Sequence, residues 1–184
     1  MLDLEFRSKG LFSCDYDVRH RGRRIAVLDR AAFRERASFE FEDVEYELRS
    51  RGLGGGKIQL LRGDDVIARA TRRSIWTSAY DIEAAMRRAP GGPGSGAEAL
   101  ARGEVDSLSL TKPSIWSSRY EIHRGRRRIG GIGKASVWGS TAKLHLREDF
   151  SLPLAVFLGY VVITLWNRQN STAAAGAGGA VVSG

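Results

Sequence analysis

The fold is decided by the stretch Tyr120-Glu-Ile-His-Arg-Gly-Arg-Arg-Arg-Ile129, which combines two short strands with the turn between them. Before the turn, apolar side chains alternate with polar ones, which is typical of a strand with one buried face. The glycine supplies the positive φ that a tight hairpin turn requires. The same order of residues recurs in Tyr16-Asp17-Val18 and Gly22-Arg23-Arg24-Ile25, so the sequence predicts a second hairpin of this kind near the N-terminus.

Both hairpins belong to a longer unit of four strands that occurs three times, over residues 4–41, 46–82 and 108–146. Each unit pairs alternating apolar residues with Gly, Asp or Ser at the connections, which indicates strands and turns. The twelve strands are expected at Leu4/Phe6, Tyr16/Val18, Ile25, Phe39/Phe41, Tyr46/Leu48, Ile58/Leu60, Val66, Tyr80/Ile82, Leu108/Leu110, Tyr120/Ile122, Ile129 and Leu144/Leu146.

An apolar segment, Leu152 to Trp166, follows the last predicted strand. A helix that is apolar on every side is either a membrane span or enclosed by protein. Fifteen residues give a helix of about 22 Å, which is short of the ~30 Å hydrocarbon core of a bilayer. A barrel of twelve strands is too wide to be filled by its own side chains. We therefore expect a central helix over residues 152–168 inside a closed barrel, with a tail anchor through 152–166 as the alternative.

The predicted fold class is mainly β, with one domain over residues 1–169. The segment 84–106 is rich in Gly, Pro and Ser and is expected to be a flexible insertion, with short helical flanks at 83–88 and 97–102. The Ala/Gly-rich tail over residues 170–184 is expected to be disordered.

The net charge and the single cysteine limit the possible functions. The chain of 184 residues carries 29 Lys and Arg against 21 Asp and Glu, a net charge of +8 that attracts polyanions. The single cysteine, Cys14, excludes an internal disulfide framework and a cysteine zinc site. Because the N-terminus lacks an apolar signal region, we expect a cytoplasmic protein, peripheral at the inner face of the cell membrane.

Two arginine-rich turns are the candidate binding site. Arg19-His-Arg-Gly-Arg-Arg24 and His123-Arg-Gly-Arg-Arg-Arg128 hold the same place in the first and third units, whereas the second unit has Arg62-Gly-Asp-Asp65. Clustered arginines at hairpin tips attract anionic headgroups and phosphates; solvated turns without a ligand are the alternative. The candidate anion-binding residues are Arg19, Arg21, Arg23, Arg24, Arg124, Arg126, Arg127 and Arg128.

No residue pattern indicates catalysis. The stretch Gly130-Gly-Ile-Gly-Lys-Ala-Ser136 departs from the spacing of a phosphate loop and lies within a predicted strand. Nothing assembles a nucleophile, a base and an orienting group, so we expect a non-enzymatic protein with no cofactor and no metal. The surface histidines and the glutamates of the wet sheet face are His20, His123, His145, Glu40, Glu42, Glu45 and Glu47. The aromatics Trp76, Trp116 and Trp138 are interpreted as core or rim packing, or as a rim that touches lipid headgroups.

Three four-stranded units followed by one apolar helix resemble the Tubby C-terminal-like superfamily, which includes Tubby proteins, phospholipid scramblases and LURP-one-related proteins. The residues that carry the resemblance are Tyr46-Glu-Leu-Arg-Ser-Arg-Gly52, Tyr120 to Ile129, and the ending Leu152-Pro-Leu to Arg168. The nearest likeness is to small bacterial LURP-one-related proteins, over residues 2 to 169. The insertion at 89–97 departs from that pattern.

The resemblance implies a closed twelve-stranded barrel around a hydrophobic helix. Tubby domains bind phosphoinositide headgroups and scramblases are linked to membrane lipid, but no residue-by-residue match to the Tubby pocket is present. The sequence thus favours a binding module that docks on anionic lipid headgroups or an acidic protein partner. A tail-anchored protein and a structural or interaction protein are the alternatives. Neither a nucleic acid nor a small-molecule substrate is expected, since no nucleic-acid-binding module is recognised.

Overall fold

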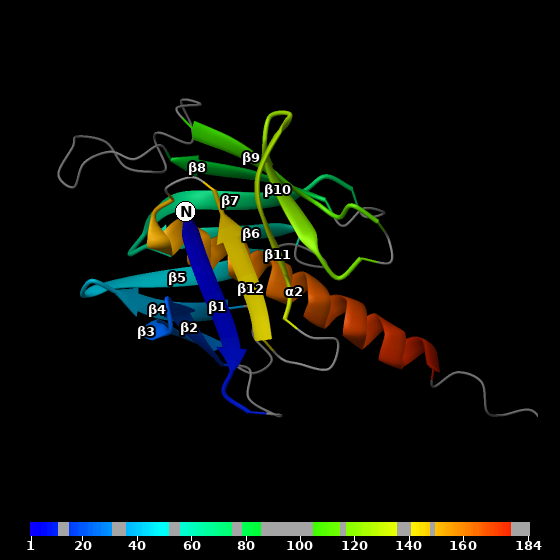
Figure 1. The fold of residues 1–184 in the computed structure, drawn as a ribbon, viewed down its shortest axis with the longest axis horizontal. Coiled ribbons are helices and arrows are strands. Elements are labelled where there is room, and N and C mark those ends of the chain that lie inside the picture. The colour runs from blue at the N-terminus through cyan, green and yellow to red at the C-terminus, as the bar shows by residue number, and fades with distance from the viewer. Residues whose placement is uncertain are drawn as a thin grey trace, which may run out of the picture.

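Twelve antiparallel strands close into a barrel around one helix (Figure 1). The computed structural model describes residues 1–10, 15–30, 36–51, 56–74, 79–85, 105–114, 117–135, 141–147 and 150–177, without the side chains of residues 30 and 170–177. The elements are β1 (Leu2–Ser8), β2 (Tyr16–His20), β3 (Arg23–Arg30), β4 (Arg36–Phe41), β5 (Val44–Arg51), β6 (Lys57–Arg62), β7 (Asp65–Arg72), β8 (Tyr80–Ala85), β9 (Val105–Thr111), β10 (Tyr120–Arg124), β11 (Arg127–Lys134), β12 (Thr141–Leu146) and α2 (Leu152–Ala177). Each strand pairs with its neighbours in sequence, and β1 pairs with β12 to close the ring.

The three predicted units are confirmed by a shared irregularity in the hairpins β2–β3, β6–β7 and β10–β11. In β2–β3, Val18 faces Ala26 and Arg19 faces Arg24, so Ile25 has no opposite residue. The registers of the other two hairpins leave Ile67 and Ile129 without an opposite residue in the same way. Such a bulge bends a strand and increases its twist. Three equivalent bulges, four strands apart, therefore help the sheet to curve into a ring.

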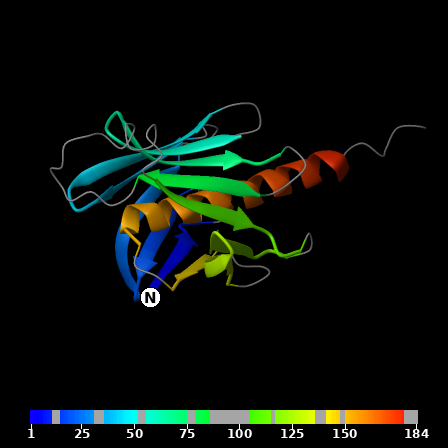
Figure 2. The same ribbon diagram turned by 90° about the horizontal axis from the view of Figure 1, so that it is seen from above.

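The central helix is confirmed, and it is longer than predicted. Every residue from Ala155 to Trp166 is buried, and Figure 2 shows the helix running through the ring of strands. The apolar faces of the strands and the helix form one core. The helix continues to Ala177, so residues 170–177 are helical and do not belong to a disordered tail. No helix among the described residues combines the length and the hydropathy needed to cross a membrane.

The ends of the predicted insertion also differ from expectation. β8 continues to Ala85 and pairs with β9, in which Val105 faces Ala85 and Asp106 faces Ala84. Residues 83–85 are therefore strand, and the helical flank predicted there is wrong because the β8–β9 pairing extends further than the apolar pattern suggested. The rest of the insertion, with the second predicted flank, lies outside the described residues.

Helix and barrel approach each other closely where Gly159 meets Phe6. A Cβ atom placed on Gly159 would lie 2.1 Å from Cζ of Phe6, and the Phe6 side chain is fully buried. The ring of Phe6 therefore occupies the space that a side chain at position 159 would need. This contact fixes the helix against β1, one of the two strands that close the barrel.

We expect Gly159→Ala to destabilise the protein by about 1–3 kcal/mol through overpacking, although alanine favours a helix by about 1 kcal/mol over glycine. Urea unfolding measures the change. The double variant Phe6→Leu/Gly159→Ala should be more stable than the sum of the two single effects predicts, because the smaller side chain makes room for the methyl group. A Gly159→Ala variant more stable than the wild type would contradict this packing.

Truncation tests whether the helix is part of the core. We expect a chain ending at Arg147 to lose the cooperative unfolding transition, because the apolar face of every strand then lacks its partner. A chain ending at Gln169 retains the helix–barrel contacts described here and should keep that transition. Circular dichroism during thermal unfolding distinguishes the two, and a folded chain ending at Arg147 would show that the helix is dispensable.

Candidate functional site

Because neighbouring strands run in opposite directions, successive connections lie at opposite ends of the barrel. The two ends therefore carry different sets of side chains. We call the end at which α2 begins the entry end; it carries Met1 and the turns β2–β3, β4–β5, β6–β7 and β10–β11. We call the opposite end, toward which α2 emerges, the exit end. Leu152 and Arg168 are about 24 Å apart along the helix axis, at about 1.5 Å per residue.

The two arginine-rich turns lie at the entry end, on one side of the ring. The turns β2–β3 and β10–β11 flank the closing pair β1–β12, so the six strands from β3 through β1 and β12 to β10 share one half of the rim. The N-terminus and the exposed Arg147 lie between the turns on the same half. Strand order thus brings together two turns that are about a hundred residues apart in sequence.

The turn conformations depend on positive φ angles. In β2–β3 both central residues have positive φ, 49° at Arg21 and 79° at Gly22, as a type I′ turn requires. In β10–β11 only the first central residue, Gly125 at 59°, has positive φ, which suits a type II′ turn. Gly125 in the β10–β11 turn takes the position that Arg21 holds in the β2–β3 turn. Arg126 is therefore the second central residue of its turn and does not need a positive φ.

Each turn also places like charges opposite one another. Arg19 faces Arg24 in β2–β3, and Arg124 faces Arg127 in β10–β11. Like charges directly opposite in an antiparallel pair are destabilising. A neighbouring carboxylate, or a bound anion, offsets that cost.

Carboxylates engage four of the eight predicted arginines. Asp17 lies 3.7 Å from Arg19 and 3.9 Å from Arg24, between the two cations. Asp106 accepts hydrogen bonds from Nε and Nη2 of Arg124, at 2.9 and 2.5 Å. Glu121 lies 3.0 Å from Arg128. These arginines serve partly as internal ion pairs.

Three of the predicted arginines remain accessible to a ligand. Arg21, Arg23 and Arg126 are exposed, and no carboxylate among the described residues pairs with them. They come from both turns, so the accessible positive charge spans the half of the rim around β1 and β12. Arg127 is exposed beside them.

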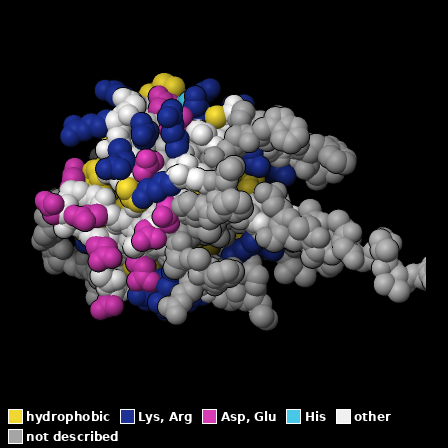
Figure 3. All heavy atoms as spheres, turned by 90° about the horizontal axis from the view of Figure 1, so that it is seen from below, with side chains coloured by type: hydrophobic (Ala, Val, Ile, Leu, Met, Phe, Trp, Pro, Cys, Tyr) yellow, Lys and Arg dark blue, Asp and Glu magenta, His cyan; other side chains and the backbone are white. Residues whose placement is uncertain are grey.

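The other described turns of the entry end are acidic. The exposed turn β4–β5 carries four carboxylates, and Figure 3 shows Asp and Glu side chains gathered toward the left of the face seen from below, with Lys and Arg side chains above them. The turn β6–β7 adds Asp64 and Asp65 beside Arg62. The carboxylates of β4–β5 are Glu40, Glu42, Asp43 and Glu45. The predicted outward orientation of these glutamates is confirmed, and among the described residues it divides the rim into a basic half and an acidic half.

The exit end carries cations that the sequence pattern did not single out. Arg51 faces Lys57 across β5–β6, and both side chains are exposed. Arg168 on α2 donates from Nη2 to Oγ of Ser50 at 3.1 Å, next to Arg51. These residues are single cations in different parts of the sequence, so only the strand pairing and the path of the helix reveal the cluster.

The three histidines contact neighbouring protein groups, and the glycine-rich stretch forms part of a strand. Nδ1 of His145 lies 2.5 Å from a carboxylate oxygen of Asp3, and Nδ1 of His20 lies 2.7 Å from the backbone oxygen of the same residue. His123 lies 3.4 Å from Glu121. Residues 130–134 are part of β11, as predicted. Cys14, Trp76, Trp116 and Trp138 lie outside the described residues.

One carboxylate near the middle of β5, Glu47, has a lowered pKa. Arg49 donates to both oxygens of Glu47, from Nε and Nη2 at 2.6 Å each. These hydrogen bonds hold the pKa of Glu47 below its ordinary value of 4.5, against burial, which raises it; the charges of Arg49 and Arg36 lower it further. Glu47 therefore offsets the repulsion between Arg36 and Arg49, which face each other across β4–β5.

We expect Glu47→Gln to cost a few tenths to about 1 kcal/mol at pH 7, since the pair is partly exposed to solvent. A lowered folded-state pKa gives stability above the unfolded value of about 4.5 and loses it as the pH falls through the folded value. The difference between the wild type and Glu47→Gln should therefore shrink below pH 4. Urea unfolding at pH 7 and pH 3 measures it, and an unchanged difference would contradict the assignment.

Comparison with known proteins adds no family. No protein-family profile, no curated protein and no solved structure matches the chain. The resemblance to the Tubby C-terminal-like superfamily therefore stays a prediction. Since a fold does not determine a function, the function has to be argued from the charged ends of the barrel.

Proposed function

We propose that the protein is a non-enzymatic binding module that docks on anionic lipid headgroups through the basic half of its entry end. The observation that carries the proposal is the placement of Arg21, Arg23 and Arg126, exposed and without carboxylate partners among the described residues, on two turns that flank β1 and β12.

A lipid surface fits this arrangement better than a compact anion. The accessible arginines project from the tips of separate turns, across six strands of the rim, and so face outward together. Each basic residue near an anionic leaflet contributes about 1 kcal/mol. Three such residues correspond to weak docking that salt screens strongly, because the Debye length is about 8 Å at physiological ionic strength.

The acidic half of the same rim restricts how the protein docks. Carboxylates on the turn β4–β5 are repelled by an anionic surface, so the barrel tilts toward β1 and β12 when it docks. An acidic protein would be attracted to the same arginines and is the second candidate partner. Docking on vesicles that contain no protein distinguishes the lipid from the acidic protein as the partner.

We expect Arg126→Glu to weaken docking of the entry end about tenfold or more, because it removes one favourable charge and adds a repelled one. A dye on the N-terminal amine of Met1, which is exposed between the two turns on the basic half, reports docking of this end by its emission shift. The titration uses phosphatidylcholine vesicles with and without about one third phosphatidylserine, at several salt concentrations.

Lys143→Glu is the matched control. It makes the same change of charge at an exposed residue of β12, on the wall of the barrel between the ends. We expect it to dock nearly as the wild type does. Equal titrations for Arg126→Glu and Lys143→Glu, or equal responses to neutral and anionic vesicles, would reject docking through these turns and leave the acidic partner.

A further inference from the structure

We infer that the exit end is a second docking surface for anionic lipid, so that one molecule bridges two membranes. The inference rests on the proposed function for the entry end and extends it to a pair of opposed sites. It starts from the cross-strand pair Arg51–Lys57, which lies beside the emerging helix at the far end of the barrel.

Among the four cross-strand cation pairs described above, Arg51–Lys57 is the one without a carboxylate partner in the described part of the chain. Asp17 lies between Arg19 and Arg24, Asp106 binds Arg124 of the pair with Arg127, and Glu47 bridges Arg36 and Arg49. Apart from those at the entry end, the described carboxylates of β5 to β8 are Glu47, Asp81 and Glu83; Asp81 is held by Arg73 at 2.7 Å, and Glu83 lies 3.9 Å from Arg69. No described carboxylate therefore compensates the two exposed cations that face each other, which costs stability unless an anion offsets it.

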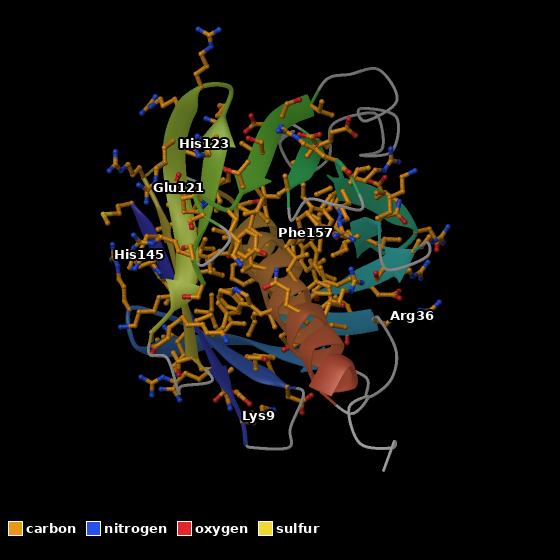
Figure 4. All side chains as sticks on the ribbon, turned by 90° about the vertical axis from the view of Figure 1, so that its right-hand side faces the viewer. Lys9, Arg36, Glu121, His123, His145 and Phe157 are labelled. Atoms are coloured by element: carbon orange, nitrogen blue, oxygen red, sulfur yellow. The ribbon has the colours of Figure 1, made fainter. Side chains whose placement is uncertain are left out.

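Further cations surround the helix at this end. Arg168 lies beside β5 through its contact with Ser50, and the backbone N–H of Arg72 donates to the oxygen of Gly56 at 2.8 Å, at the connection between β5 and β6. On the other side, Nζ of Lys134 lies 5.6 Å from the centre of the Trp166 ring. Figure 4 looks onto this end and shows the strands around the helix, with Lys9 and Arg36 on the rim.

The aromatic contacts hold this cationic rim around the helix. Lys112 lies over the Tyr120 ring at 5.9 Å, and Nε2 of Gln169 lies 3.4 Å from the hydroxyl oxygen of Tyr120. The ammonium groups of both lysines therefore lie over aromatic rings, as in cation–π contacts. Arg51, Lys57 and Arg168 lie together on the β5–β6 side of the helix, which continues to Ala177, so an anionic surface can approach the exit end on that side.

The two ends are far enough apart to act independently. The helix axis spans about 24 Å between Leu152 and Arg168, three times the Debye length of about 8 Å. Docking at one end therefore leaves the other free for a second vesicle. The predicted consequence is that anionic vesicles cluster in the presence of the protein.

The test compares docking with clustering. Dynamic light scattering follows phosphatidylcholine vesicles with and without about one third phosphatidylserine, at a molar excess of lipid, while the dye at the entry end reports docking. Arg51→Glu puts a carboxylate opposite Lys57, so the fold should become slightly more stable to heat. We expect this variant to dock through the entry end as the wild type does but to cluster anionic vesicles about tenfold more slowly.

Arg126→Glu and Lys143→Glu complete the set with the same change of charge. Arg126→Glu should also cluster vesicles poorly yet still float with them, through the exit end, and adding Arg51→Glu should remove that flotation. Lys143→Glu should cluster vesicles as the wild type does.

Clustering by Arg51→Glu at the wild-type rate would overturn the second surface. A wild type that docks through the entry end without clustering vesicles would overturn bridging alone, whereas a silent entry-end dye would reject the proposed function as well.

Discussion

The whole structure depends on filling the interior of the barrel. Twelve strands enclose more space than their own inward side chains occupy, and α2 supplies the missing apolar volume with every residue from Ala155 to Trp166 buried. The fit is close: the ring of Phe6 takes the place of a side chain at Gly159. Because the helix is held on all sides, the two ends of the barrel keep a fixed separation, and the surfaces at those ends are rigid relative to each other.

Much of this architecture could be predicted from alternation and repetition. The spacing from Phe6 to Tyr16 recurs in all three units, and it predicts the strands without knowledge of their pairing. The sequence does not reveal the bulge residues Ile25, Ile67 and Ile129, because an extra residue in one strand is visible only against its partner. The predicted end of the helix is too early, because the polar residues after Trp166 mark where the helix leaves the core and not where it stops.

The site was only half visible in the sequence. Runs of arginine at two turns are conspicuous, but whether each cation is accessible depends on Asp17, Asp106 and Glu121, which lie up to eighteen residues away. Conversely, Arg51, Lys57 and Arg168 are unremarkable as single residues and form a surface only through strand register and the course of the helix. The charged side chains of this barrel therefore form separate clusters at its two ends, and the net charge of +8 describes neither cluster.

The pairing of the first strand with the last shapes how the chain is made. Leu2 pairs with Leu146, so β1 waits for nearly all of the chain before it gains its second neighbour, and the helix that fills the interior is synthesised later still. Closures between such distant segments are slow, and an open sheet exposes strand edges and apolar surface in the meantime. A ribosome-bound chain of this protein thus keeps strand edges and apolar surface exposed until the buried residues of α2, Ala155 to Trp166, have emerged.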